Sequence, residues 1–256
     1  MTRLERGLSL PLFNLFKMMS LGSTDIPVFI YHSVLSSGGP GAINVEIFKR
    51  HLQFLRENDF QVVPLAALLE PAAKPKPARG NLRRVSLTFD DGYVDFFHNC
   101  WTLLKDYNFP ATIFLVVDKI GREGYLSEGQ IKEVSSGGLI SLGSHGMAHK
   151  YLIGLSHADL RREVRDSKVA LERRFSSPVD FFSYPWGGFS ARTQDAVREA
   201  GYKAAFTTNQ FLADRNGKDD YAFKRITISE KDGSIRFLAK VSGFAYLFAR
   251  RMKREE

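Results

Sequence analysis

The chain contains 256 residues, of which 44% are hydrophobic and 25% are charged. A chain of this kind can bury a sizeable core, so its composition excludes a disordered or fibrous protein. The net charge of +8 favours anionic partners, but no nucleic-acid-binding motif accompanies it, and we expect no nucleic-acid partner. Cys100 is the only cysteine, which excludes an intrachain disulfide.

Residues 1–25 are predicted to form an amphipathic N-terminal extension. The apolar stretch from Leu8 to Leu21 is interrupted by Pro11 and Lys17, and no small-residue cleavage site follows it, so we expect no secretory signal. No apolar run approaches the roughly 20 residues of a membrane-spanning helix. Together with the single cysteine, these features favour a cytoplasmic protein.

Strand and helix patterns alternate through most of the remaining chain. The first strand is an apolar run that ends in His32, and the glycine-rich residues 36–41 after it predict a mobile loop. The predicted strands are Pro27–His32, Phe60–Val63, Val85–Phe89, Ala111–Val117, Leu139–Gly143, Phe181–Tyr184 and Lys203–Thr207; the predicted helices are Val45–Asn58, Leu65–Leu69, Val94–Tyr107, Ser127–Val134, Ser156–Phe175 and Arg192–Ala200. The proline-rich residues 71–80 predict a surface connection. This alternation predicts a parallel α/β sheet, open or closed into a barrel, in a single domain over residues 26–230.

Two adjacent carboxylates follow the strand that ends at Phe89. Successive strand side chains point to opposite sides, but a turn at Asp91 and Gly92 can bring Asp90 and Asp91 to one rim of the sheet. The carboxyl ends of strands are where ligands and catalytic groups collect in α/β folds. The alternative is a polar turn that only caps the following helix.

Two histidines follow another strand, four residues apart. In a helical turn this spacing would place the rings of His145 and His149 on one face, which suits the chelation of one divalent ion. Two histidines, one aspartate and an open position are typical of a catalytic metal site. The alternative is a pair of loop histidines that bond to the backbone.

A third strand ends in the sequence Tyr184-Pro185-Trp186-Gly187. A rigid turn of this composition can present a backbone N–H and an aromatic wall to a bound ligand. The alternative is a hydrophobic turn between a strand and a helix.

Taken together, the three stretches resemble the polysaccharide deacetylases, the NodB-homology family of metal-dependent carbohydrate esterases. Thr88–Gly92 matches the first motif of that family, His145 and His149 match the second, and the Tyr-Pro-aromatic-Gly stretch matches one branch's form of the third. The resemblance covers roughly residues 26–229 and implies a distorted parallel (β/α) barrel. It also implies removal of an N-acetyl group from an amino sugar.

The resemblance implies roles for specific residues. Asp91, His145 and His149 would hold a divalent metal, expected to be zinc, with cobalt or nickel as alternatives, and Asp90 would be the catalytic base. A bound ion of this kind supplies an acidified water and a polarised amide. The bound metal and the backbone N–H of Trp186 would stabilise the oxyanion. Tyr184, Pro185, Trp186 and Gly187 would contact the substrate.

Three positions depart from the family pattern. Many members have an arginine that orients the base where this chain has Ser183, and many have Ser or Thr where it has Gly146. The family commonly uses a late histidine as general acid, but the last histidine here, His157, starts a helix. We therefore take His32 as the candidate acid, because it ends a strand at the same rim and has a near-neutral unperturbed pKa. The alternative is that His32 only shapes the pocket.

Residues 231–256 are predicted to form a basic amphipathic helix. Its apolar face contains Ile235, Leu238, Val241, Phe244, Leu247 and Phe248, and its basic end contains Arg250, Arg251, Lys253 and Arg254. Such a helix can lie on an anionic membrane, or its apolar face can pack on the barrel. The membrane alternative would suit a lipid-linked sugar at the inner face of the membrane.

The sequence thus predicts a metal-dependent N-deacetylase that acts on a polysaccharide or glycolipid. Two alternatives stay open. One is a catalytically silent carbohydrate-binding protein on the same fold, and the other is a metal-dependent hydrolase of a different amide, such as a formyl group.

Overall fold

The structure is a computed structural model that describes residues 26–39, 41–70, 83–208 and 219–241. The predicted N-terminal extension, the connection at 71–80 and residues 242–256 lie outside the described residues. The strands are β1 (Val28–Tyr31), β2 (Ser33–Leu35), β3 (Ala42–Asn44), β4 (Phe60–Val62), β5 (Arg83–Phe89), β6 (Ala111–Leu115), β7 (Ile140–Ser144), β8 (Phe181–Ser183), β9 (Ala204–Thr207), β10 (Phe223–Lys224) and β11 (Ile226–Thr227). The helices are α2 (Val45–Glu57), α3 (Trp101–Tyr107), α4 (Glu128–Ser136), α5 (His157–Arg161), α6 (Ser167–Phe175), α7 (Ala191–Glu199) and α8 (Ser234–Val241).

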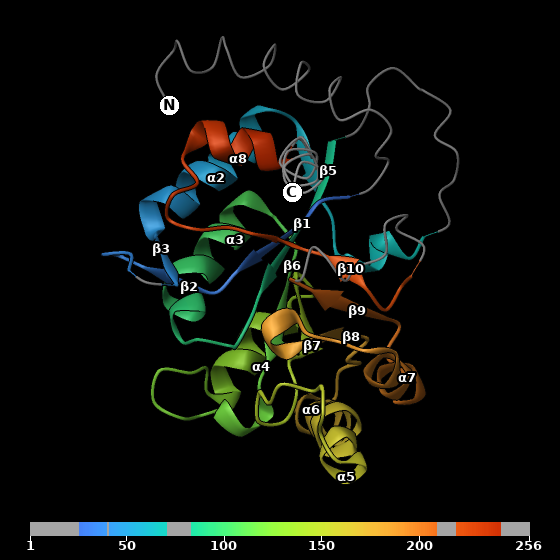
Figure 1. The fold of residues 1–256 in the computed structure, drawn as a ribbon. Helices are drawn as coiled ribbons and strands as arrows, with labels where there is room; N and C mark the ends of the chain where they lie inside the picture. The colour runs from blue at the N-terminus through green and yellow to red at the C-terminus, as the bar shows by residue number, and fades with distance from the viewer. Residues whose placement is uncertain (1–25, 40, 71–82, 209–218, 242–256) are drawn as a thin grey trace.

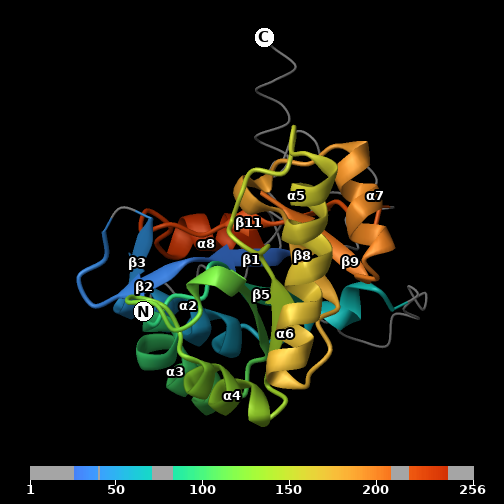
Figure 2. The same ribbon diagram turned by 90° about the horizontal axis from the view of Figure 1, so that it is seen from below.

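The main sheet is parallel throughout its strand order, β10-β9-β8-β7-β6-β5-β1-β11, and β4 pairs with β5 beside this path. Strands β2 and β3 form a separate parallel pair around the predicted loop at 36–41. In Figures 1 and 2 the helices surround the sheet. Because all strands of the sheet run the same way, their carboxyl ends meet at one rim.

A single short stretch of chain joins the two edges of the sheet. Strand β10 pairs with β9 at one edge, and β11, one residue later, pairs with β1 at the other. The residue between them is Arg225, which is 1% exposed and donates its backbone N–H to the carbonyl oxygen of Thr207 at 3.0 Å. This stretch nearly closes the sheet, so the predicted parallel barrel is confirmed. The closing strands themselves were not predicted.

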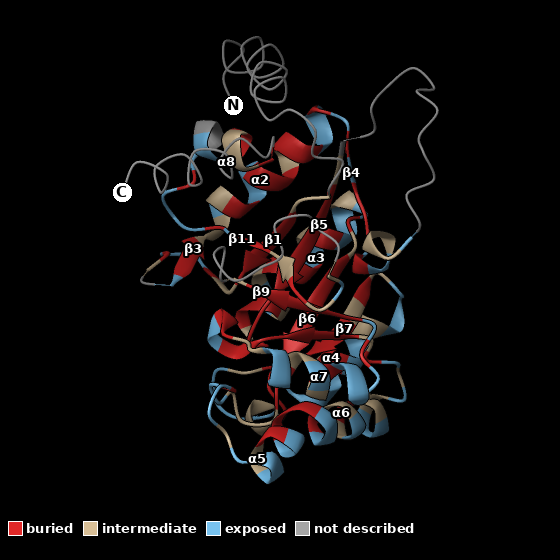
Figure 3. Ribbon diagram, turned by 45° about the vertical axis from the view of Figure 1, so that its right-hand side comes forward, coloured by how far each residue is buried: buried red, intermediate tan, exposed pale blue. Residues whose placement is uncertain are grey.

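The central strands of the main sheet are largely buried, as Figure 3 shows by their red colour. Strand β1 reads Val-Phe-Ile-Tyr and β6 reads Ala-Thr-Ile-Phe-Leu, and every residue of both is buried. Continuous apolar runs of this kind are typical of parallel strands that helices cover. The outer faces of the helices are exposed, which is why their apolar residues recur at helical spacing.

Two predicted helices are interrupted by π-helical turns. Such turns occupy Phe96–Cys100 (η2), before α3, and Arg162–Asp166 (η4), between α5 and α6. A π turn inserts a residue into the helical repeat, so a search for 3.6-residue spacing reads across it as one continuous helix. The predicted strand at Ala111–Val117 also ends early, at Leu115, and a 3-10 turn follows at Val117–Lys119 (η3).

The described half of the predicted C-terminal helix packs on the barrel. In α8, Phe237, Leu238 and Val241 are at most 4% exposed. The ring of Phe237 stacks on that of His51 from α2, with 3.9 Å between the ring centroids. These three apolar side chains are therefore part of the core. Within the described residues, no helix combines the length and the apolar character needed to cross a bilayer.

Candidate active site

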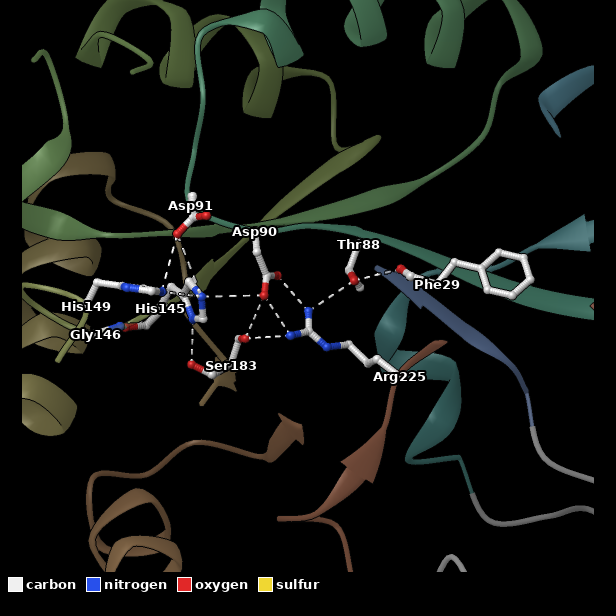
Figure 4. Close-up of polar contacts among 10 residues, drawn as sticks. Phe29, Thr88, Asp90, Asp91, His145, Gly146, His149, Ser183 and Arg225 are labelled. Atoms are coloured by element: carbon white, nitrogen blue, oxygen red, sulfur yellow. Dashed lines mark hydrogen bonds and ion pairs between the residues drawn. The ribbon is translucent and has the colours of Figure 1, made fainter. Parts of the chain in front are cut away.

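A pocket of about 300 Å³ opens at the carboxyl rim of the barrel. Asp90 and Asp91 line it from the end of β5, and His145 and His149 line it from the segment after β7. The chain thus brings both carboxylates and both histidines of the sequence motifs into one pocket. Figure 4 shows how their side chains converge.

The turn after β5 separates the two carboxylates. Asp90 continues the strand, because its N–H still donates to the carbonyl oxygen of Tyr31 at 3.0 Å. Asp91 and Gly92 then adopt left-handed φ angles of 70° and 75°. A β carbon at Gly92 would lie 2.8 Å from the side chain of Leu115, so a glycine suits this turn both by conformation and by space.

The two histidines converge, but not through a helical turn. The segment has left-handed residues at Gly146, with φ of 86°, and at His149, with φ of 62°. The predicted helical geometry was therefore wrong, although the predicted proximity holds, since the two Nε2 atoms lie 3.2 Å apart. The Nδ1 atom of His145 bonds to the carbonyl oxygen of Ser183 at 2.8 Å, which turns its Nε2 atom toward the pocket.

Three of these side chains fit a divalent cation. Asp91, His145 and His149 each offer one ligand atom, and these atoms lie within 4.8 Å of one another. Asp91 Oδ1 is 3.4 Å from His149 Nε2 and 3.9 Å from His145 Nε2. It is buried and has no hydrogen-bond partner within the described residues, which is costly unless a cation binds there.

The protonation of the two histidines suits the same ion. Burial lowers the pKa of His145 from its ordinary value, against the opposing effect of Asp90 and Asp91. Burial and the neighbouring His145 lower the pKa of His149 to about 4. Both imidazoles are therefore neutral at pH 7, and the neutral ring is the form that binds a metal.

Asp90 faces a different partner, an arginine that the sequence reasoning missed. The guanidinium of Arg225 donates to both carboxylate oxygens of Asp90, at 2.6 and 2.7 Å. The Ser183 hydroxyl donates to Asp90 at 3.0 Å and accepts from Arg225 at 2.7 Å. Arg225 also bonds to the Thr88 hydroxyl at 3.2 Å (Figure 4). The arginine that is absent at position 183 is thus replaced by Arg225, which reaches Asp90 from the stretch that closes the barrel.

This ion pair keeps Asp90 ionised. Burial alone would raise the pKa of Asp90, but the adjacent Arg225 guanidinium, with help from His145, holds it well below its usual range. A detectable signal did exist for Arg225. Residues 226–228 read Ile-Thr-Ile, an alternation with β-branched residues that is typical of a strand, and Arg225 directly precedes them.

The remaining predicted residues occupy different places around the pocket. His32 lines the pocket just beyond β1, and Trp186 lines it with its ring 72% exposed, 5.2 Å from the ring of His149. Tyr184 and Gly187 also line the pocket. Pro185 is buried and lies behind Gly146 rather than in the lining.

Three lining residues were not predicted: Tyr93, Lys119 and Thr208. Tyr93 follows Gly92 directly, and its ring stacks on that of Tyr125 with 5.2 Å between the centroids. Lys119 places its ammonium 5.0 Å from the centre of the Tyr125 ring. Burial and the adjacent Asp91 raise the pKa of the Tyr93 hydroxyl, so it stays protonated and can donate a hydrogen bond. Its position next to the Asp-Asp-Gly stretch was the signal that could have identified Tyr93.

The fold and the site define a parallel α/β barrel with an Asp-His-His cluster and a buried carboxylate at its carboxyl rim. Residues 78–205 match the family model described as polysaccharide deacetylase. The chain is 34% identical over 205 residues to YxkH of Bacillus subtilis (strain 168), named as a candidate polysaccharide deacetylase, with 80% of this chain and 71% of YxkH covered. The chain belongs to the polysaccharide deacetylase family, whose members are metal-dependent hydrolases of linear amides.

Other relatives are more distant. The poly-beta-1,6-N-acetyl-D-glucosamine N-deacetylase of Staphylococcus aureus (strain MRSA252) is 25% identical over 210 residues, with 77% of this chain and 71% of that protein covered. The solved structure of the Streptococcus pyogenes deacetylase PplD in complex with acetate has a TM-score of 0.75 at 23% identity, and covers 86% of this chain and 99% of its own. At that identity the likeness shows the fold.

Proposed function

We propose that this protein is a metal-dependent N-deacetylase that removes the acetyl group from an N-acetylated amino sugar of a polysaccharide or glycolipid. The observation that carries the proposal is the pairing, in one pocket, of an ionised buried Asp90 with three converging ligand atoms. Family membership and the named substrate of the Staphylococcus aureus relative support it.

Asp91, His145 and His149 would hold the ion, which we propose to be zinc, with cobalt or nickel as alternatives. Such an ion, when bound, acidifies a water and polarises a carbonyl oxygen. Asp90 Oδ2 lies 3.5 Å from His145 Nε2, so the carboxylate stands beside the ligand cluster and can accept a proton there. Arg225 and Ser183 fix the orientation of that carboxylate, which is the requirement for a general base.

The other half of the reaction needs a proton donor and an oxyanion donor. We assign the proton that the leaving amine requires to His32, which lines the pocket and whose imidazole can carry a proton. The N–H of Trp186 is the proposed oxyanion donor, and one such donor is worth about 3 kcal/mol. The exposed Trp186 ring, with Tyr184 and Gly187, would form a wall for the sugar, and Pro185 would support it from behind.

A catalytically silent binding protein is less consistent with this pocket. The absence of an arginine at position 183 favoured that alternative, but Arg225 supplies the missing interaction. A hydrolase of another amide, such as a formyl group, would use the same residues and differ only in the substrate it accepts.

A lipid-linked sugar and a peripheral contact with an anionic membrane, from the cytoplasmic side, are a finer form of the proposal. The net charge of +8 supports them, whereas Phe237, Leu238 and Val241 of α8 are buried and do not. Co-sedimentation with vesicles that contain an anionic lipid, at low and high salt, tests this contact. Protein that stays in the supernatant at low salt would contradict it.

The deacetylase proposal is tested by measuring metal content and acetate release in the same samples. We expect about one ion per wild-type chain and acetate release from N-acetylglucosamine oligomers, with both lost in Asp91→Ala and His145→Ala. His157→Ala is the matched control, because His157 is exposed at the start of α5 and should change neither readout. A wild type that binds oligomers but takes up no zinc, cobalt or nickel and releases no acetate would favour the silent protein.

A further inference from the structure

Glu163 is a buried carboxylate that the proposed reaction does not use. It lies on the π turn η4 and is 1% exposed. Both of its carboxylate oxygens accept the backbone N–H of Ala148, at 3.2 and 3.0 Å. Within the described residues it makes no salt bridge, which is uncommon for a carboxylate at this depth. The hydrogen bonds of its carboxylate therefore go to one place, the loop between His145 and His149.

That loop is held from two sides. The carbonyl oxygens of Gly146 and Met147 accept the N–H groups of Val117 and Asp118, at 3.2 and 2.9 Å, from the segment after β6. On the other side, Glu163 accepts from Ala148. Ala148 directly precedes His149, whose left-handed backbone costs free energy and persists only where its surroundings fix it.

Gly146 and Glu163 fit one another. A β carbon at Gly146 would lie 2.8 Å from Glu163 Oε2, closer than two such atoms normally approach. The glycine therefore lets the carboxylate come against the loop, and its φ of 86° is one that other residues rarely adopt. Many family members have Ser or Thr at this position, and here the Glu163 carboxylate occupies the space beside the glycine.

The backbone around Glu163 is anchored to β7, the strand that directly precedes His145. The Ser167 hydroxyl donates to the carbonyl oxygen of Glu163 at 2.6 Å and lies 2.9 Å from the Ser144 hydroxyl at the end of β7. The Ser144 hydroxyl in turn accepts the N–H of Gly146 at 3.2 Å. Side chain and backbone of Glu163 thus join the π turn to both ends of the loop.

We propose that Glu163 is a positioning residue for the metal site: its carboxylate holds the Ala148 N–H and so sets His149 in the geometry that binds the ion. This proposal rests on the ion-binding part of the proposed function. It predicts that the affinity for the ion depends on a side chain that touches neither the ion nor the substrate.

The test measures zinc affinity by chelator competition and the visible absorption spectrum of the cobalt-loaded protein. Glu163→Ala should weaken zinc binding about 10- to 100-fold and change the cobalt spectrum, as loss of an outer hydrogen bond does at other metal sites. Glu163→Gln should bind zinc within about threefold of wild type, because its amide oxygen still accepts the Ala148 N–H. Gly146→Ala, which displaces the carboxylate, should weaken binding in the same direction as Glu163→Ala.

Glu172→Ala is the matched control. Glu172 also accepts a backbone N–H, that of Val179 at 3.1 Å, and it pairs with Lys168, but it lies on α6 away from the pocket. Its loss should lower the melting temperature of the metal-free protein without changing zinc affinity. Wild-type affinity in a folded Glu163→Ala, or equal losses in Glu163→Gln and Glu163→Ala, would overturn the positioning role. A wild type that binds no ion would instead overturn the proposed function itself. The two failures can be told apart because this test measures ion binding alone and uses no glycan.

Discussion

The two halves of the pocket are built in different ways. The base half consists of Asp90, Arg225 and Ser183, which lie on or directly beside strands, are fully buried and bond to one another. The ion half consists of Asp91, His145 and His149, two of which have left-handed backbones after the strands end. The Oδ1 atom of Asp91 has no hydrogen-bond partner within the described residues.

The interactions of the base half are complete in the folded protein, whereas those of the ion half are completed only when a cation binds. In the base half, both oxygens of the buried carboxylate are bonded to the guanidinium, so charge and geometry are settled by folding. In the ion half, the two histidine Nε2 atoms face one another and Asp91 Oδ1 lacks a hydrogen-bond partner within the described residues, which is unfavourable until a cation binds. Changes to the base half should therefore act on chemistry and stability, and changes to the ion half on affinity.

The largest effect should come from Asp90→Asn, which separates the two halves functionally. Removing a general base typically costs 10²- to 10⁴-fold in rate, so we expect kcat to fall by about that factor. The ion content should stay at the wild-type level, because Asp90 is not among the three converging ligands. Acetate release and metal analysis on the same preparation check both statements. Loss of the ion in this variant would mean that the two halves are not separate.

Arg225→Met should have the next largest effect, on the free energy of unfolding. Removing one partner of a buried ion pair leaves a buried charge and costs about 3 to 5 kcal/mol. The double variant Asp90→Asn with Arg225→Met should recover part of that loss, because the carboxylate is no longer charged. Urea unfolding of the four metal-free proteins gives this cycle. Strictly additive losses would show that the pair is not coupled.

The same variant should shift the pH dependence of kcat/KM. In the wild type the low pKa of Asp90 keeps the base ionised far into acid, so Asp90 does not set the acid limb. Without Arg225, the main opposition to the effect of burial is lost and the pKa of Asp90 rises, so activity should be lost at a higher pH as the pH falls. A wild-type acid limb in a folded Arg225→Met would contradict the assignment of Asp90 as the base.

The contrast between the halves also explains what the sequence could predict. Asp90, Asp91 and His145 follow the ends of two parallel strands, and His149 lies four residues after His145, so their meeting at one rim follows from the parallel topology. Arg225 lies between two strands of two residues each, far along the chain from Asp90, and such short strands have a weak sequence pattern. Its role depends on how the barrel closes, which is a tertiary property.

Local backbone geometry was the other part that sequence reasoning missed. Four-residue spacing correctly placed His145 near His149, but a glycine at the second position allowed a left-handed turn instead of a helical one. Glu163 was missed for a related reason, since the π turn that aims it at the loop leaves the apolar repeat of the helix readable as continuous.

The smallest effect should come from Trp186→Ala, which affects the wall of the ion half without touching its ligands. The ring is 72% exposed, so its loss should change the melting temperature little. If the ring contacts the sugar, its loss should raise KM by about 2- to 12-fold, equivalent to roughly 0.5 to 1.5 kcal/mol of aromatic contact. Trp186→Phe should restore most of this, since it keeps an aromatic face.

Both Trp186 variants keep the backbone N–H, and they therefore separate two roles assigned to one residue. The N–H is the proposed oxyanion donor, so kcat and ion content should stay near wild type in both variants while KM changes. A fall in kcat with unchanged KM would instead mean that the bulky ring, which lies 5.2 Å from the ring of His149, helps to hold the ion half in place. That outcome would mean that Trp186, as well as Glu163, holds the residues of the ion half in position.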